Sequence, residues 1–210
     1  MTVLPLLPLT PQPPLPLDWQ PRLGEADFFI SDANRAAVDW LARPAAWPMP
    51  RVLLIGPEAS GKTHLASLFA ARTGARIIDE ADTRPDGEPM FHAWNAASAV
   101  RPLLLAARRL PRGWAHRLPD LASRLAATPL ITLSEPDDAL LAAVLTKRFA
   151  DRGLKAPPEL VQWLSLRIER SFAAAARAVA LLDEAALAQR RELSVPLARA
   201  LFDTQLDLGL

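Results

Sequence analysis

The stretch RVLLIGPEASGKTHLASLFAARTG, residues 51–74, decides the fold of this chain. Its first five residues, 51–55, are mostly apolar and predict a short strand buried on both faces of a parallel sheet. A helical pattern runs from Lys62 to Gly74, a residue type suited to a helix C-terminus. Between strand and helix lies GPEASGKT, 56–63, a full match to G-x-x-x-x-G-K-[ST]. This order of strand, loop and helix predicts a phosphate-binding loop, or P-loop.

The residues of the loop have separate roles toward a nucleotide. Gly56 and Gly61 allow backbone angles that point successive N–H groups at phosphate oxygens. Lys62 reaches the β- and γ-phosphates, and Thr63 is a ligand for Mg²⁺. The partial positive charge at the N-terminus of the helix adds to the attraction. The motif therefore predicts a site for ADP or ATP with Mg²⁺.

An acidic pair follows the second apolar stretch. Residues 75–82 read ARIIDEAD and predict a strand that ends in acids. Asp79 is the candidate for holding the Mg²⁺ shell, and Glu80 is the candidate for polarising a water molecule. This strand follows the P-loop helix directly, a spacing that suits a small-molecule kinase, so a P-loop phosphotransferase stays open at this point.

Strands alternate with helices along the first two thirds of the chain, and only helices follow. Apolar runs at 101–107 and 129–133 predict two more strands. The helical patterns after Pro136 are 137–152, 157–169, 171–191 and 195–206. Such a pattern predicts an α/β fold with a parallel sheet, followed by an all-helical lid. The expected domains are 1–21, a proline-rich extended tail, 22–134, the α/β core, and 135–210, the lid.

Composition narrows the classes of function. The chain has 210 residues, 50% of them hydrophobic, which suits one domain with a proper core, or one domain and a small satellite. A net charge of +1 gives no reason to expect avid, non-specific nucleic-acid binding. The absence of cysteine excludes disulfides and cysteine-ligated metals. Prolines interrupt the first 21 residues, so we expect no signal peptide, no membrane span and a cytoplasmic location.

Three segments outside the P-loop point to a family. They are MFHAWN, 90–95, LPDLASRL, 118–125, and RIERSFAAAARAVALLDEAAL, 167–187. Together they resemble the DnaA/Hda branch of the AAA+ ATPases, and the resemblance runs from about residue 12 to residue 206. It implies a P-loop AAA+ core with a helical lid, and a role as a regulator that acts with DnaA and the replication clamp.

The resemblance also assigns roles to two arginines. Arg124 in DLASRL matches the family's arginine finger, which reaches the phosphate of a nucleotide held by a neighbouring subunit. Arg170 in RIERSF matches the lid arginine, sensor 2, which contacts the bound nucleotide. Arg167 lies three residues earlier, and on a continuous helix it would share the same face and compete for that role.

The chain departs from the family pattern in three respects. The family has a further strand and helix before the acidic strand, so we expect a sheet that is one strand short. Ala106 and Ala107 stand where the family has a polar sensor 1 residue, which puts the chain's own ATP hydrolysis in doubt. No DNA-binding domain of the DnaA type follows the lid, so sequence-specific DNA binding is not expected.

The proline-rich tail contains a candidate clamp-binding peptide. QPPLPL, 12–17, matches the family form Q-L-x-L-P-L at Gln12, Leu15, Pro16 and Leu17. An extended peptide stiffened by proline loses little entropy on docking. Its position ahead of the core, where related proteins carry theirs, makes it the preferred contact with the DNA polymerase III sliding clamp.

A second candidate lies at the other end of the sequence. QLDLGL, 205–210, matches the general clamp-binding form Q-L-[SD]-L-[FL] at Gln205, Leu206 and Leu208. Its letters fit better than those of the first peptide, but it follows the last predicted lid helix. It is therefore the alternative contact.

Three functions remain open on the sequence alone. The first is a regulator of replication initiation that binds ADP or ATP, docks on the sliding clamp and uses Arg124 to promote hydrolysis of DnaA-bound ATP. The second is a small-molecule phosphotransferase that uses Asp79. The third is a non-catalytic, DnaA-related adaptor. Self-association, nucleotide preference and enzymatic activity of the chain itself stay undecided.

Overall fold

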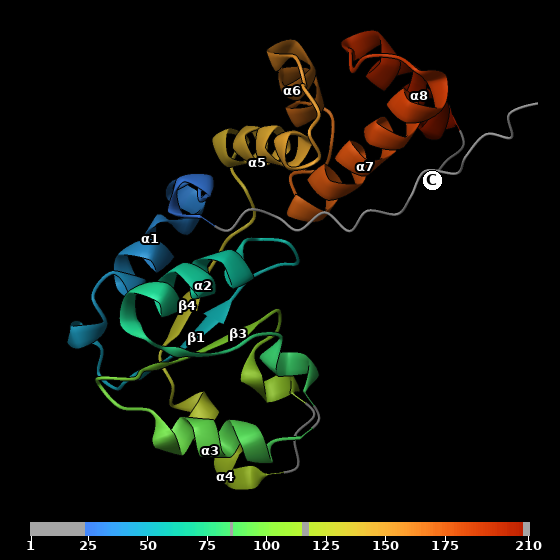
Figure 1. Cartoon of the computed structure of the whole chain (residues 1–210). Helices are drawn as coiled ribbons and strands as arrows, with labels where there is room; N and C mark the ends of the chain where they lie inside the picture. The colour runs from blue at the N-terminus through green and yellow to red at the C-terminus, as the bar shows by residue number, and fades with distance from the viewer. Residues whose placement is uncertain (1–23, 85, 115–117, 208–210) are drawn as a thin grey trace, which may run out of the picture.

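The computed structural model describes residues 24–84, 86–114 and 118–207 (Figure 1). The first part of the chain forms α1 (Asp32–Leu41), β1 (Arg51–Ile55), α2 (Lys62–Thr73), β2 (Arg76–Ile78), α3 (Glu88–Ala96), β3 (Leu103–Ala107), α4 (Pro119–Ala126) and β4 (Leu130–Thr132). The second part forms α5 (Asp138–Asp151), α6 (Pro158–Ser165), α7 (Phe172–Gln189) and α8 (Val195–Asp207). Short 3₁₀ turns stand at Glu25–Asp27, Pro44–Ala46, Ala81–Thr83 and Pro111–Gly113.

The described strands form one parallel sheet of four strands in the order β2-β3-β1-β4. The P-loop strand β1 is central and pairs with β3 on one side and β4 on the other. Helix α2 runs into β2 with only Gly74 and Ala75 between them, so no further strand fits there. The predicted α/β fold is thus confirmed, and its sheet lacks the strand that the family pattern has at this point.

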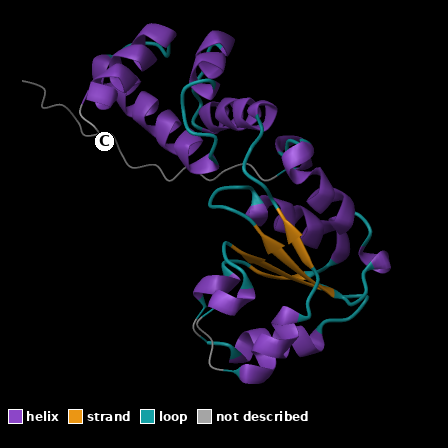
Figure 2. Cartoon of the chain, turned by 180° about the vertical axis from the view of Figure 1, so that it is seen from behind, coloured by secondary structure: helices purple, strands orange, loops and turns teal. Residues whose placement is uncertain are grey.

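Alternate side chains of the strands pack against two separate layers of helices. Leu53 of β1 and Leu105 of β3 face α3 and α4, where Met90 and Leu121 are buried. Their neighbours in the strands face α1 and α2, for example Leu54 of β1. Figure 2 shows the strands between these two layers. Burial on both faces explains why the central strands β1 and β3 read as continuous apolar runs.

The four helices α5 to α8 bury a core of their own. Leu145, Leu164, Val179 and Leu197 come one from each helix and are almost fully buried in a single cluster. Figure 1 shows these helices gathered at one end of the molecule, beside α1 and the P-loop end of the sheet. The structure therefore places an all-helical lid next to the edge at which the parallel strands end.

Two predicted elements end earlier than their apolar patterns indicate. Strand β2 stops at Ile78, because Glu80 takes a left-handed backbone conformation (φ +50°) and a 3₁₀ turn follows. Helix α6 stops at Ser165, before the segment RIER. Among the described residues, we find no helix with the length and hydropathy that a membrane span requires.

Candidate functional site

A cavity of about 670 Å³ lies between the P-loop and the lid. The core supplies Asp27, Phe28, Phe29, Asn34 and residues 59–64 to its lining, and the lid supplies residues of α5 together with Phe172. A volume of this size accommodates a ligand such as a nucleotide. A ligand in this cavity would touch the core and the lid at the same time.

The backbone of the P-loop explains both of its glycines. Gly61 has φ +87°, a left-handed conformation that side chains disfavour. Gly56 has no such constraint, but a Cβ atom there would lie 3.0 Å from the Leu133 Cβ and 3.1 Å from the Leu133 carbonyl oxygen. One glycine is therefore required by backbone geometry and the other by close packing against the end of β4.

Lys62, the first residue of α2, is held by the loop that it follows. Its Nζ donates hydrogen bonds to the carbonyl oxygens of Gly56 (2.9 Å) and Pro57 (2.5 Å). Burial lowers the pKa of Lys62, the nearby Arg108 lowers it further, and Asp79 opposes both effects. Lys62 thus lies against the backbone of the loop, and its contact with phosphate stays a prediction.

Thr63 and Asp79 lie together at the mouth of the P-loop. The Thr63 hydroxyl donates a 2.6 Å hydrogen bond to the Asp79 Oδ2 atom, and Asp79 Oδ1 accepts a 2.9 Å bond from the Glu80 N–H. A hydroxyl and a carboxylate are oxygen ligands that suit Mg²⁺, directly or through water. No cluster of three or more metal-ligating side chains occurs among the described residues, so a Mg²⁺ ion here would need phosphate and water for the rest of its shell.

Arg108, which the sequence analysis did not single out, bridges the acids around this site. It follows β3 directly, and its guanidinium lies 3.0 Å from Glu58 in the P-loop and 3.7 Å from Glu80. Ala106 and Ala107, where a polar sensor 1 residue was expected, are buried in the sheet. Arg108 therefore lies just after Ala106 and Ala107, the position that lacks a hydroxyl. Its guanidinium pairs with Glu80, the residue predicted to polarise a water molecule.

The next arginine secures the turn after the acidic pair. Asp82 is buried, and its Oδ2 atom lies 3.3 Å from the Arg109 Nε atom. The other oxygen, Oδ1, has no hydrogen-bond partner within the described parts of the chain. Asp82, the last residue of ARIIDEAD, thus holds its loop against the end of β3. Only the folded structure reveals this role.

Arg124 lies on α4, and the described lining of the P-loop cavity does not include it. Its Nη1 donates to the Asn95 side-chain oxygen (2.8 Å), and its Nε donates to Asp120 (3.1 Å). The guanidinium also stacks over the rings of Phe91 and Trp94, at 5.0 and 4.8 Å from their centroids. These two aromatic residues pack against the core of the sheet, and they also contact this cation. The side chain keeps 32% exposure, so a second molecule can reach it.

The lid arginines correct one step of the sequence argument. Residues 166–171 connect α6 and α7, so Arg167 and Arg170 do not share a helix face. Arg170 is 67% exposed and lies 2.9 Å from Asp138, and neither residue is among the described residues that line the cavity. Arg167 stacks on Trp163 instead. A contact between Arg170 and nucleotide stays a prediction, and this arrangement does not support it.

A different lid arginine reaches the cavity. Arg148, on α5, is part of the lining beside Gly61, Lys62 and Thr63. Burial lowers its pKa, and the neighbouring Arg152 does so as well. The helical pattern of 137–152 placed Arg148 on α5, but nothing in that pattern indicated which face of the helix meets the core.

The two clamp-binding candidates differ in what the structure describes. Gln12, Leu15, Pro16 and Leu17 lie outside the described residues. The backbone at Gln205 and Leu206 is helical and forms the last turn of α8, and Leu208 again lies outside. The C-terminal candidate would have to unwind this turn to bind as an extended peptide.

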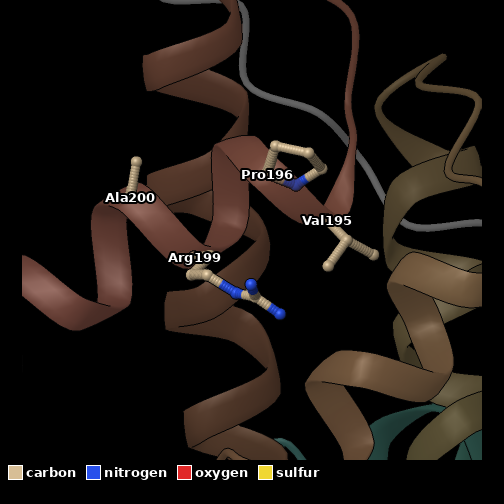
Figure 3. Close-up of a pocket in the computed structure, with 4 residues that line it drawn as sticks. All are labelled: Val195, Pro196, Arg199 and Ala200. Atoms are coloured by element: carbon tan, nitrogen blue, oxygen red, sulfur yellow. The ribbon is translucent and has the colours of Figure 1, made fainter.

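A second cavity, of about 440 Å³, lies at the start of α8, and Figure 3 shows its lining. Val195, Pro196, Arg199 and Ala200 form it, and Arg199 carries the only charge among these four. It lacks the glycine-rich backbone and the acidic pair of the P-loop region, so it shares none of the features that predict a nucleotide site.

Comparison with known proteins agrees with this geometry. Residues 137–202 match the family model described as the Hda lid domain. Domain III of the replication initiation protein DnaA from Thermotoga maritima superimposes with a TM-score of 0.70, at 14% identity, over 90% of this chain and 98% of that one. DnaA from Aquifex aeolicus, bound to AMPPCP, gives a TM-score of 0.56 at 16% identity, over 79% of this chain and 66% of that one.

Other matches extend the fold family further. The RuvB branch-migration motor of Thermotoga maritima gives a TM-score of 0.58 at 14% identity, over 84% of this chain and 70% of that one. An uncharacterized protein of Haemophilus influenzae is 30% identical over 107 residues, which are 51% of this chain and 46% of that protein. The match thus spans about half the length of this curated relative. The chain therefore has a fold similar to that of DnaA domain III, and its residues 137–202 match the Hda lid domain.

Proposed function

We propose that this protein is a nucleotide-binding regulator of replication initiation that promotes hydrolysis of the ATP held by DnaA. The observation that carries the proposal is that the P-loop and Arg124 lie at different places on the core. A complete P-loop faces the lid cavity, whereas Arg124 lies on α4, apart from the cavity lining of its own chain. An arginine placed in this way suits action on a nucleotide that another molecule holds.

The P-loop cavity would hold ADP or ATP. Gly56, Gly61 and Lys62 would bind the phosphates, and Thr63 with Asp79 would hold a Mg²⁺ ion that offsets their charge. DnaA of Aquifex aeolicus in its AMPPCP complex shares this fold, which supports the assignment.

The chain's own hydrolysis would be slow. Glu80 is paired with Arg108, and Ala106 and Ala107 carry no hydroxyl that could position a water molecule. The bound nucleotide would then act as a structural ligand that sets the position of the lid, and the chemistry would occur at DnaA.

Docking on the sliding clamp would bring the regulator to DNA. The proposed contact is the peptide at Gln12, Leu15, Pro16 and Leu17, with Gln205, Leu206 and Leu208 as the alternative. The helical backbone of the last turn of α8 favours the first of these, because the general clamp-binding form is an extended peptide.

The central test measures hydrolysis of DnaA-bound ATP in the presence of DNA-loaded clamp, with and without this protein. An arginine finger contributes about 10³- to 10⁵-fold in rate, so Arg124→Ala should abolish the stimulation. Arg72→Ala, a change of an exposed arginine on α2, is the matched control and should retain it. Equal stimulation by the Arg124→Ala variant and the unsubstituted protein would exclude the proposal and favour the non-catalytic adaptor.

The phosphotransferase alternative makes a different demand on Asp79. In that reading Asp79 accepts a proton from a substrate hydroxyl, but here both of its oxygens already accept hydrogen bonds, from Thr63 and from the Glu80 backbone. ATP consumption that depends on an added hydroxylated metabolite, and not on DnaA, would favour this alternative.

A further inference from the structure

The lid presents an unpaired cation to the P-loop cavity. Arg148 is partly buried, and its Nε atom is fully buried without a hydrogen-bond partner in the described structure. No carboxylate among the described residues lies within ion-pair distance of its guanidinium, and the same residue lines the cavity.

The acids near Arg148 are engaged elsewhere. Asp151 lies one turn further along α5 and accepts a 2.7 Å hydrogen bond from Lys147. Asp183 of α7 pairs with Arg152 at 3.4 Å. Arg148 therefore faces a second positive charge at Arg152, and the nearest acid is held by another cation.

A buried guanidinium nitrogen without a partner is costly, because it loses its water and gains no hydrogen bond in return. An unsatisfied buried polar group calls for a specific explanation, and a bound anion is one such explanation for a cation that lines a cavity. The groups that share this cavity, Gly61, Lys62 and Thr63, are those of a phosphate-binding loop. The anion that suits the cavity is accordingly a phosphate group.

We propose that Arg148 binds a phosphate oxygen of the nucleotide held by the P-loop, and so acts as the cation through which the lid senses that nucleotide. The inference rests on the nucleotide binding in the proposed function. The inference assigns the lid's contact with nucleotide to Arg148 on α5, the first lid helix, in place of Arg170 in the segment before α7. Arg170, the residue that the family resemblance assigns, is exposed and already paired with Asp138.

This assignment gives the lid a reason to respond to nucleotide. With phosphate present, Arg148 and Lys62 bind one anion from opposite domains, which draws α5 toward the P-loop. Without it, the positive charges of Lys62, Lys147 and Arg148 in the cavity lining repel one another, and Asp27 and Asp151 offset only part of that repulsion. The position of the lid relative to the core then depends on occupancy of the site.

The test compares ADP affinity and thermal unfolding for four variants of the full chain. Arg148→Met keeps the length of the side chain and removes its charge, and Arg148→Lys keeps the charge. Arg170→Met tests the competing residue, and Arg177→Met, on the exposed face of α7, is the control. Affinity is measured by titration calorimetry with ADP and Mg²⁺, and the midpoint of unfolding is measured with and without ADP.

Arg148→Met should weaken ADP binding about tenfold or more, the scale of a lost hydrogen bond to a charged group, and Arg148→Lys should recover part of the loss. Without ADP, the unfolding midpoint of Arg148→Met should equal or exceed that of the unsubstituted protein, because an uncompensated buried charge is gone. A residue with a structural role alone would lower that midpoint.

Three results would overturn the inference. The first is an Arg148→Met variant whose affinity stays within about twofold of the unsubstituted protein. The second is a loss of affinity in Arg170→Met that Arg148→Met does not show. The third is a lower midpoint without ADP combined with no recovery by Arg148→Lys. Failure of the unsubstituted protein to bind ADP would refute the proposed nucleotide site as well, whereas a failed Arg124 test would leave this inference intact.

Discussion

The two P-loop glycines provide a sharp test of the site, because each should resist substitution for a different reason. In Gly56→Ala the new methyl group meets the Leu133 Cβ atom at 3.0 Å and the Leu133 carbonyl oxygen at 3.1 Å. It also lies 2.9 Å from the Ser60 hydroxyl, which can rotate away, but the backbone of Leu133 cannot. In Gly61→Ala the methyl group has room, and the strain is in the backbone at φ +87°.

These geometries set the expected magnitudes. Overpacking against rigid neighbours costs about 1–3 kcal/mol, and a left-handed conformation costs a residue with a Cβ roughly 1–2 kcal/mol. For a chain of this size each kcal/mol lowers the unfolding midpoint by about 2–4 °C. The Gly56 carbonyl also accepts a hydrogen bond from Lys62, so a shift of the loop at Gly56 should weaken ADP binding as well.

Thermal unfolding by circular dichroism, together with ADP titration, checks these values. Ser60→Ala combined with Gly56→Ala should restore little stability, because the Leu133 contacts remain. Gly153→Ala is the control for backbone strain away from the site, since it shares a positive φ of 70°, has open space around it, and should leave ADP affinity unchanged. A Gly56→Ala variant with the midpoint and ADP affinity of the unsubstituted protein would refute the packing argument.

Three further predictions follow from the charges around the site and from the tail. The pKa of Lys62 is lowered in the folded state, so the unfolded state binds more protons at pH values just below the ordinary lysine pKa. The free energy of unfolding of the ligand-free protein should therefore rise with pH in that range. In a series of urea-unfolding measurements across this range, Lys62→Met should flatten the rise. Arg108→Ala removes two exposed ion pairs and should change the free energy of unfolding by less than about 1 kcal/mol. It should also free Glu80 and so raise the chain's own ATP turnover. Unchanged turnover would show that the ion pair with Arg108 does not restrain Glu80. Replacing Leu15 and Leu17 with alanine should abolish capture by immobilised clamp and leave ADP affinity intact, whereas loss of capture only on substitution of Leu206 and Leu208 would move the contact to the other end.

Much of the fold could be predicted from sequence because its signals are local. The apolar run at 51–55 and the glycine motif after it depend only on neighbours along the chain. The same holds for the start of α7 at Phe172, where the Ser171 side chain accepts a hydrogen bond from the Ala174 N–H. The expected loss of one strand followed from spacing together with the family resemblance, and in the structure only Gly74 and Ala75 separate α2 from β2.

The lid arginines show where such reasoning fails. The helical pattern of 157–169 continues past the end of α6, because the residues of RIER suit a helix as well as a turn. The choice between them depends on packing: α6 and α7 bury Leu164 and Val179 in one cluster, and the chain must turn between them. Arg167 and Arg170 consequently lie in the connection between α6 and α7, and they do not share the helix face that was expected of them.

The sequence by itself predicted the features on which the proposed chemistry rests: a P-loop motif, an acidic pair at the end of a strand, and an arginine in a segment that resembles a partner-facing motif. These features depend on residue type and spacing, which are properties of the sequence before the chain folds. Only the tertiary structure decided which charges meet. It brought Arg108 to Glu80 and Arg148 to the P-loop cavity, and it turned Arg124 toward Asn95 and Asp120. Contacts between residues far apart in sequence arise from the packing of helices against the sheet and of the lid against the core, and no local pattern encodes them.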